Sequence, residues 1–388
     1  MSNIIINGYV DLSFEPVKEV FDNNFKQFDE LGSAFSVKHN GQTVVDLKAG
    51  PIAIESEVDW SDQTLVNVWS STKGIVAICY CILVSRGLIS YQDKVCKYWP
   101  EFGVNNKSDI TIADLLSHKA GLAALHEGAT IHDLLSINAV DELANATPLW
   151  APSKTSGYHI LTYGTLVTEL FRRIEGRFLK KFIEQEFYKD RGWDIHIGLP
   201  SEREIDAAEI SVSHTLDLSI RNNASELQHR VFTSPTLNPL DANLQEWKSA
   251  DLPSANGFSN AKAIADIYAA LINSSDTLVS KEALSQAIEA QFEGDDIIMA
   301  SFSRWACGFV LNTDGVFGPN PNSFGHSGFR TFIVSILAES TLCEEIVEDS
   351  LAERQRVGKL VSLIQRLPDG VPTSFLELNC ILFDEFMI

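Results

Sequence analysis

The sequence predicts an α+β protein in which both ends of the chain build one β-sheet and a helical lobe is inserted between them. Two strand-like segments near the start flank Asn40-Gly41, a strong short-range signal for a hairpin. The middle of the chain has mostly helical spacing, and strand-like segments return only after Trp305. We expect a single domain over 1–388, with an α/β lobe at about 1–65 and 298–388 and a helical lobe at about 66–297.

The individual elements follow in order. A helix over about 15–31 precedes the hairpin strands 34–39 and 42–47. The expected helices of the middle are 112–116, 161–174, which Gly176 ends, and 261–271. Later, strands are expected at 305–311 and 331–337 and a polar helix at 343–367, followed by an apolar tail at 375–383 that has no obvious partner.

Composition limits the possible partners. The 388 residues carry a net charge of −22, which disfavours binding to nucleic acids and anionic membranes. No apolar run approaches membrane-spanning length, and the first residues do not resemble a signal peptide. The six cysteines show no CxxC spacing and the histidines are scattered, so we expect a cytoplasmic protein without a metal or cofactor.

The segment from Ser70 to Lys73 is the strongest functional signal. It places a hydroxyl and an amine one helical turn apart, on the same helix face. The residues that follow, 74–84, are apolar on nearly every side, which predicts a buried helix. Because burial disfavours the ammonium form, Lys73 is expected to act as a free amine that activates Ser70. The alternative is that Ser70 only caps the helix.

A second Ser-x-x-Lys, from Ser259 to Lys262, serves as an internal control. It precedes an amphipathic helix on which Lys262 falls on the polar side. We therefore interpret Ser259 as the N-cap of that helix.

Two further elements have both a functional and a structural interpretation. Tyr158 lies just before the predicted helix 161–174. A nearby lysine could lower the pKa of Tyr158 so that it takes the proton of the nucleophile. The structural alternative is that Tyr158 is a core residue at the helix entry. Gly328 precedes the late strand and permits close approach to its backbone. The N–H groups of Phe329 and Ser70 could form an oxyanion hole there, although a plain turn fits the same residues.

Together these segments resemble the serine β-lactamase-like superfamily, and most of all the class C β-lactamase-related group that includes family VIII carboxylesterases. With the N-terminal helix and hairpin, the resemblance covers about 21–328. The matching segments are Trp-Ser-Ser-Thr-Lys-Gly at 69–74, Tyr-Trp-Pro-Glu-Phe at 98–102, Leu-Leu-Ser-His-Lys-Ala-Gly-Leu at 115–122, Gly-Tyr-His at 157–159, Pro-Ser-Ala-Asn-Gly at 253–257 and Phe-Gly-His-Ser-Gly at 324–328.

The resemblance implies an antiparallel sheet flanked by helices, an all-helical lobe, and a site between them. It implies that Ser70 is the acylated nucleophile, that Lys73 is its base or proton shuttle, and that Tyr158 helps to deprotonate Ser70 and protonates the leaving group. His326 stands where β-lactamases of the superfamily carry the lysine of Lys-Thr-Gly. We assign Asn256 to the substrate site, and interpret His118, also in a family motif, as structural.

Departures from the β-lactamase pattern point toward the esterase branch. The Tyr-x-Asn of β-lactamases becomes Tyr158-His159-Ile160, and a histidine replaces lysine at His326. From Arg330 onward the sequence no longer matches the family.

The favoured function is therefore a serine hydrolase that forms an acyl-enzyme with a small short-chain carboxylic ester. A β-lactamase or DD-peptidase-like enzyme is the first alternative. A catalytically weak binding or scaffold protein of the same fold is the second, and labelling by a fluorophosphonate, lost in Ser70→Ala, distinguishes it. The sequence leaves the oligomeric state open.

Overall fold

The computed structural model describes residues 4–27, 30–211, 224–272, 277–313, 315, 317, 320–328, 331–336 and 378–383. The predicted helix at 343–367 lies outside these residues. Among the described residues, no helix combines the length and apolar character needed to cross a bilayer.

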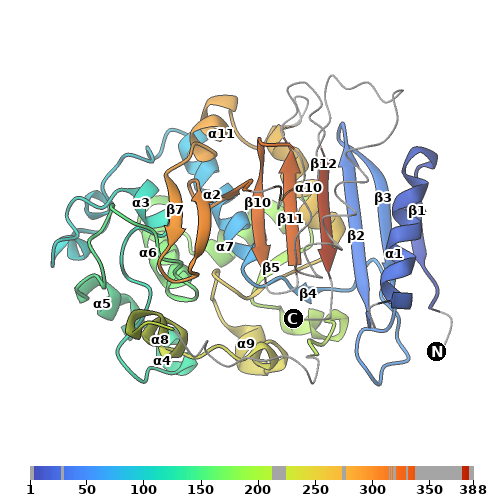
Figure 1. Cartoon of the computed structure of the whole chain (residues 1–388), viewed down its shortest axis with the longest axis horizontal. Coiled ribbons are helices and arrows are strands. Elements are labelled where there is room, and N and C mark those ends of the chain that lie inside the picture. Colours follow the sequence, from blue (N-terminus) through green and yellow to red (C-terminus); the bar gives the residue numbers. More distant parts are fainter. Residues whose placement is uncertain are drawn as a thin grey trace.

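A nine-stranded antiparallel sheet forms the centre of the α/β lobe, in the order β1-β3-β2-β12-β11-β10-β9-β8-β7 (Figure 1). Its three N-terminal strands lie at one edge and the others come from the last hundred residues, so both ends of the chain build it. The strands are β1 (Asn7–Val10), β2 (Ser33–His39), β3 (Gln42–Ala49), β7 (Phe292–Asp296), β8 (Ser301–Trp305), β9 (Val310–Leu311), β10 (Ser323–Gly328), β11 (Thr331–Ile336) and β12 (Leu378–Phe383).

The predicted hairpin is confirmed. Strands β2 and β3 pair across Asn40 and Gly41, which both have positive φ angles of 50° and 73°. Positive φ at both central residues is typical of a turn whose twist matches the flanking strands, and asparagine and glycine tolerate it best.

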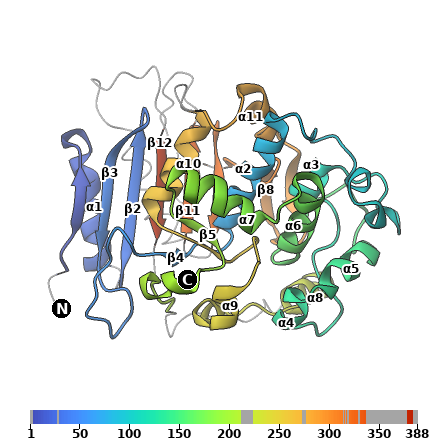
Figure 2. The same cartoon turned by 180° about the vertical axis from the view of Figure 1, so that it is seen from behind.

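Helices cover both faces of the sheet and form the second lobe. Helix α1 lies on one face (Figure 1), and α2 and α10 lie on the other, as the view from behind shows (Figure 2). The helices are α1 (Glu15–Gln27), α2 (Ser71–Ser85), α3 (Ile112–Leu116), α4 (Ile131–Leu135), α5 (Asn138–Asn145), α6 (Thr162–Glu175), α7 (Leu179–Ile183), α8 (Glu226–Thr233), α9 (Gln245–Ser249), α10 (Ala261–Ile272) and α11 (Lys281–Ala287).

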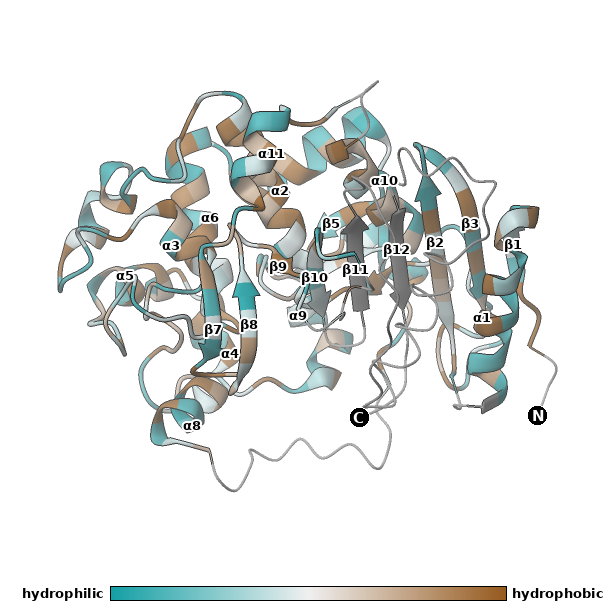
Figure 3. Ribbon diagram, turned by 45° about the horizontal axis from the view of Figure 1, so that its top comes forward, coloured by the Kyte–Doolittle hydropathy of each residue, from teal (hydrophilic) through white to brown (hydrophobic). Residues whose placement is uncertain are grey.

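Helix α2 runs through the middle of the molecule. Every residue from Ser71 to Leu83 is buried, and the ribbon is largely brown, the colour of apolar residues, in Figure 3. The helix packs between strand β10 and the helices α6, α7 and α11. A helix that is apolar all round must be enclosed in this way, as the sequence predicted.

Two expectations about strands need correction. The segment expected as one strand at 305–311 is divided between β8 and β9, because Gly308 turns the chain at a φ of 87°. A side chain there would lie 2.8 Å from Ala77 of α2, so only glycine fits at this turn. The apolar tail does have a partner: β12 lies between β2 and β11 and joins the two halves of the sheet.

The two lobes are also more interleaved than predicted. Strand β7 begins at Phe292, before the expected boundary at about 298, and α10 packs on the sheet although its residues fall in the range expected for the helical lobe. A small second sheet in the order β4-β6-β5 was not predicted. Its strands are β4 (Val66–Asn67), β5 (Ile195–Ile197) and β6 (Gly257–Ser259).

Candidate active site

The small sheet positions the start of helix α2. The Val68 N–H donates to the carbonyl of Gly257, and Gly257 N–H donates to the Thr72 hydroxyl at 2.9 Å. That hydroxyl donates in turn to the Trp69 carbonyl. Trp69 has a φ of 48°, a left-handed conformation that is unfavourable by about 1–2 kcal/mol for a residue with a side chain. The surrounding contacts therefore hold the residue before Ser70 in a strained turn.

Ser70 is the N-cap residue of α2, but its side chain makes no capping hydrogen bond. It remains partly exposed, whereas the residues that follow it are buried. The hydroxyl instead lies 3.1 Å from Nζ of Lys73. This geometry excludes the interpretation that Ser70 only caps the helix.

Lys73 is fully buried and has no carboxylate partner among the residues that the structure describes. Its Nζ donates to the backbone carbonyls of Ile160 at 2.9 Å and Ser254 at 2.8 Å. Burial holds its pKa well below the usual value. In its neutral form the amine would donate its two hydrogens to these carbonyls and direct its lone pair at the Ser70 hydroxyl, an arrangement in which a lysine can act as a base toward a serine.

Tyr158 lies beside this pair. Its ring centroid is 4.8 Å from Nζ of Lys73, and its hydroxyl is near enough to Ser70 for the two side chains to interact. We expected Lys73 to lower the pKa of Tyr158, and this is wrong: burial raises that pKa, with a smaller contribution from the charge of Asp296. The physical reason is that burial disfavours tyrosinate, and Lys73, whose ammonium form burial also disfavours, does not offset this effect.

The backbone that carries Tyr158 is held at three successive N–H groups. Gly157 N–H donates to the carbonyl of His118, Tyr158 N–H to a carboxylate oxygen of Asp296, and His159 N–H to Nδ1 of His118. His118 is fully buried, and its ring packs edge-on against Tyr158 at 4.7 Å. Its place agrees with the structural role that we assigned to it.

His159 braces the same loop. Its Nδ1 donates to the carbonyl of Gly157 at 2.7 Å, and its Nε2 accepts the N–H of Leu122 at 2.9 Å. Burial lowers its pKa to about 4, so the ring is neutral at pH 7. The residue that replaces the asparagine of the β-lactamase pattern is therefore a buried support.

His326 lies close to these residues on β10. Its ring centroid is 6.3 Å from that of Tyr158, and its Nδ1 donates to the Ser327 carbonyl at 2.7 Å. Burial, with Lys73 nearby, lowers its pKa to about 3. The buried Nε2 has no hydrogen-bond partner among the described residues. At this position the site offers a neutral acceptor rather than a fixed positive charge.

Gly328, at the end of β10, passes very close to the start of α2. A side chain there would lie 2.5 Å from the Val68 carbonyl and 3.1 Å from the Ser71 nitrogen. Only glycine allows this approach, which brings the strand end beside Ser70. Phe329, whose N–H we predicted to contribute to the oxyanion hole, lies outside the described residues, so this remains a prediction.

Asn256 does not present its amide to the site. Both amide hydrogens are donated to backbone carbonyls, those of Trp247 at 3.0 Å and Ala250 at 2.8 Å, and Oδ1 accepts the Leu252 N–H. The residue is fully buried and its backbone bridges to Trp69. This geometry corrects its assignment to the substrate site: Asn256 supports the turn before Ser70.

Sequence reasoning missed two residues that contact Tyr158. Asp296 accepts its N–H, and the ring of Trp305 stacks on its ring at 5.5 Å and 10°. Neither lies in a motif segment, and both approach Tyr158 from a distant hairpin. The described residues contain no group of three or more His, Cys, Asp or Glu side chains that could hold a metal ion.

Proteins that resemble this chain show which family it belongs to. The beta-lactamase family model matches residues 21–341. The chain belongs to the beta-lactamase family. The esterase/beta-lactamase LipL of Mycobacterium tuberculosis (strain ATCC 25618 / H37Rv) is 34% identical over 277 residues, which are 69% of this chain and 64% of LipL. The esterase EstB of Burkholderia gladioli is 30% identical over 125 residues, or 31% of this chain and 32% of EstB. The chain thus matches less than two thirds of the length of either relative.

Solved structures of beta-lactamase-like proteins share the fold. A family VIII carboxylesterase superposes with a TM-score of 0.79 at 31% identity, covering 85% of this chain and 89% of the other. A penicillin-binding protein homologue from Caulobacter crescentus gives 0.77 at 29% identity, with 85% and 90% covered. EstA from Arthrobacter nitroguajacolicus Rue61a gives 0.77 at 27% identity, with 97% and 92% covered. The predicted α+β fold is therefore confirmed.

Proposed function

We propose that the protein is a serine hydrolase that cleaves small, short-chain carboxylic esters through an acyl-enzyme on Ser70. The observation that carries the proposal is the buried Lys73, whose Nζ lies 3.1 Å from the Ser70 hydroxyl and whose two other acceptors are backbone carbonyls. A buried amine without a counter-ion is unfavourable for folding, so its retention supports a catalytic task over a scaffold role.

In the proposed reaction, the neutral amine of Lys73 takes the Ser70 proton as Oγ bonds to the ester carbonyl carbon. The carbonyl oxygen becomes an oxyanion, which the N–H groups of Ser70 and Phe329 stabilise. When the bond to the alkoxide breaks, Tyr158 gives its proton to the alkoxide and regains one from the Lys73 ammonium. The raised pKa of Tyr158 supports this part, because it keeps the phenol protonated.

Deacylation repeats these steps with water. Water loses a proton to Lys73 by way of Tyr158 and attacks the acyl carbon. The Ser70 oxygen then leaves and regains its proton, and the carboxylic acid is released. No metal or cofactor takes part.

The choice of ester rests on His326. Its neutral ring offers no fixed positive charge for a carboxylate such as that of a β-lactam. The esterase names of LipL and EstB, and the structural similarity to a family VIII carboxylesterase, favour the same choice. β-Lactam or peptide cleavage is the second candidate, because LipL is also named a beta-lactamase and a penicillin-binding protein homologue shares the fold.

Hydrolysis of p-nitrophenyl butyrate and of nitrocefin, by wild type and Ser70→Ala, tests the proposal. We expect ester turnover that disappears in Ser70→Ala and little nitrocefin cleavage. Dominant nitrocefin cleavage would support the second candidate. A folded wild type that acts on neither substrate and takes no fluorophosphonate label would contradict both.

We also propose that the enzyme acts in the cytoplasm. Among the described residues Cys79, Cys81 and Cys307 are free and buried, which is common for reduced thiols in that compartment. The net charge of −22 favours a small-molecule substrate over nucleic acid or a membrane surface.

A further inference from the structure

We propose that Asp296 is a positioning residue that fixes Tyr158 against Ser70. The inference rests on the proposed function, because it assigns a role within that same site. Asp296 is fully buried at the end of strand β7 and touches neither Ser70 nor Lys73 through any hydrogen bond that the described residues show. Its action on the reaction must therefore pass through Tyr158.

The carboxylate of Asp296 joins two distant segments. Its Oδ1 accepts the N–H of Tyr158 at 3.1 Å and those of Ile298 and Met299 at 2.9 Å each. Its Oδ2 accepts the hydroxyl hydrogen of Ser156 at 3.2 Å. A carboxylate that only shaped its own turn would need the two bonds to Ile298 and Met299. The bonds to Ser156 and Tyr158 have a different purpose, since they tie this turn to the loop of the site.

The hairpin of strands β7 and β8, which carries Asp296, also holds the ring of Tyr158. Strand β8 carries Trp305, which stacks on that ring, while His118 packs edge-on against it. Trp305 also contacts His118, at 4.6 Å. Tyr158 is thus fixed at its backbone by Asp296 and at its ring by two aromatic neighbours, so a shift of the backbone would slide the ring out of its stack.

This fixation matters because the proposed reaction requires Tyr158 to exchange protons with groups at Ser70. A displacement of about 1 Å at such a group can reduce a rate by about 10²-fold. The substrate would still bind, because Asp296 makes no contact on the exposed side of Ser70. The expected signature is a lower kcat with little change in KM.

Three variants separate acceptor geometry from general stability. Asp296→Ala removes the acceptor. Asp296→Asn keeps an oxygen for the three N–H groups, and its amide can donate to the Ser156 oxygen, which leaves the one hydroxyl hydrogen of Ser156 for the Ser117 carbonyl at 3.1 Å. Asp296→Glu keeps the charge but moves the oxygens by one methylene group.

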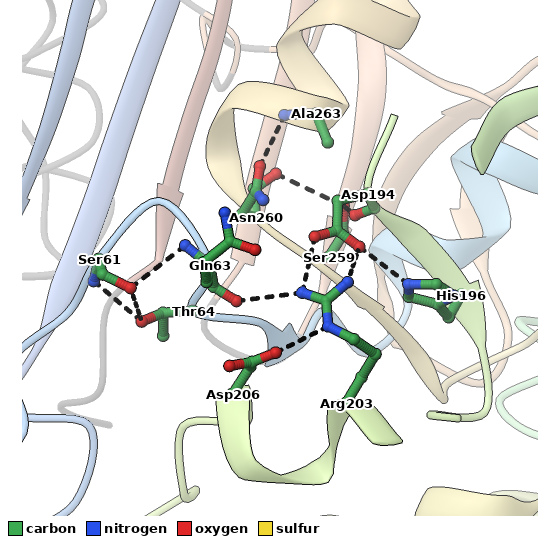
Figure 4. A network of polar contacts seen from close by, with 10 residues as sticks. All are labelled: Ser61, Gln63, Thr64, Asp194, His196, Arg203, Asp206, Ser259, Asn260 and Ala263. Atoms are coloured by element: carbon green, nitrogen blue, oxygen red, sulfur yellow. Dashed lines mark hydrogen bonds and ion pairs between the residues drawn. The ribbon is translucent and has the colours of Figure 1, made fainter. Parts of the chain in front are cut away.

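The network around Asp194 provides a matched control. Asp194 is a largely buried carboxylate that binds Arg203 through both oxygens and His196 through one, as Figure 4 shows. None of the described contacts links it to Tyr158. Asp194→Asn should lower the melting temperature while kcat and KM on p-nitrophenyl butyrate stay at the wild-type values.

We expect Asp296→Ala to lower kcat about 10- to 100-fold with KM within about threefold, and Asp296→Asn to restore kcat to within about threefold of wild type. A kcat for Asp296→Ala within threefold of wild type would overturn the proposal. So would an Asp296→Asn variant that is as slow as the alanine variant.

If Asp296→Ala does not fold, the kcat of Asp296→Glu is measured instead. A kcat below that of wild type supports the proposal, and an unchanged kcat overturns it. Failure of the proposed function would be visible separately, as a wild type without ester turnover. In that case crystal structures test whether Asp296 positions Tyr158. Wild type and Asp296→Asn are compared with Asp296→Ala or Asp296→Glu. The proposal is supported if Tyr158 loses its contact with Ser70 in the alanine or glutamate variant but keeps it in the other two proteins, and it is overturned if the contact is unchanged in all of them.

Discussion

The chain contains two Ser-x-x-Lys segments with the same spacing and very different surroundings. At the first, Lys73 is fully buried and contacts the Ser70 hydroxyl, and its other hydrogen-bond partners among the described residues are backbone carbonyls. At the second, the Lys262 side chain is 53% exposed and pairs with Asp266 one turn further on. The Ser259 hydroxyl donates to the backbone carbonyl of Asp194 (Figure 4).

The difference shows that spacing alone does not make a nucleophile. Lys262 is exposed to solvent and pairs with the carboxylate of Asp266. Lys73 is buried without a carboxylate partner among the described residues, and burial lowers its pKa well below that of an ordinary lysine. We therefore attribute the reactivity proposed for Ser70 to the apolar helix behind Lys73 rather than to the four-residue motif.

Replacing each lysine with methionine should give the largest difference in activity between the two Ser-x-x-Lys segments. Lys73→Met removes the proposed base but keeps a long apolar side chain in the core, so kcat/KM on p-nitrophenyl butyrate should fall about 10²–10⁴-fold, the usual contribution of general acid–base catalysis. Lys262→Met removes only an exposed ion pair, which contributes about 0.3–0.5 kcal/mol to stability and nothing to the reaction. Steady-state kinetics of both variants measure this difference.

A circular dichroism spectrum and a melting curve must accompany these kinetics, because the Ile160 and Ser254 carbonyls lose their donor in Lys73→Met. Near-normal turnover in a folded Lys73→Met would show that another group is the base. A large loss in Lys262→Met would mean that the exposed pair matters to the site after all.

Low pH should destabilise the region around Ser70 and Lys73 more than the region around Ser259 and Lys262. The folded protein keeps His159 and His326 neutral, with pKa values of about 4 and about 3, whereas the unfolded chain takes up these protons near pH 6.5. Their contribution to stability is therefore complete above pH 6.5 and is lost as pH falls toward the folded-state values. Between pH 6.5 and 4.5 each histidine lowers the unfolding free energy by on the order of 2–3 kcal/mol.

Urea unfolding at pH 7, 5.5 and 4.5 measures this loss. His326→Asn should flatten the pH dependence, while His132→Ala, which alters an exposed histidine, should follow the wild-type curve. A wild-type stability that stays constant down to pH 4.5 would show that the buried rings accept protons at little cost.

Sequence patterns predicted most of the parts that depend on local chemistry. The Asn40-Gly41 turn, the buried helix α2 and the end of α6 at Gly176 all follow from residue types that act within one turn of the chain. The contact between Ser70 and Lys73 follows from helical spacing in the same way.

The features that sequence reasoning missed depend on distant contacts. Nothing near residues 378–383 indicates that they form the strand between β2 and β11, because a lone apolar segment does not specify its partners. Asp296 and Trp305 reach Tyr158 from a hairpin that follows it by more than a hundred residues. The pKa of Tyr158 was predicted in the wrong direction because it depends on burial, which the motif does not encode.

The smallest expected effect concerns the N-caps of helices α2 and α10, which follow the two Ser-x-x-Lys serines. The structure corrects our assignment of Ser259 as the cap of α10: the side chain of Asn260 accepts the Ala263 N–H at 2.8 Å, whereas Ser259 lies in strand β6. Asn260→Ala should therefore lower the unfolding free energy by about 1 kcal/mol, the usual effect of losing a cap. Ser70→Ala should lower it less, because Ser70 makes no capping bond and its hydroxyl loses only the contact with Lys73.

Urea unfolding of these two alanine variants, beside wild type, measures both values, and fluorophosphonate labelling should be lost in Ser70→Ala alone. If Ser70→Ala lost about as much stability as Asn260→Ala, the stability measurement would not distinguish a capping bond from the contact with Lys73. If neither variant lost stability, capping would not distinguish the two segments, and the burial of Lys73 alone would set them apart.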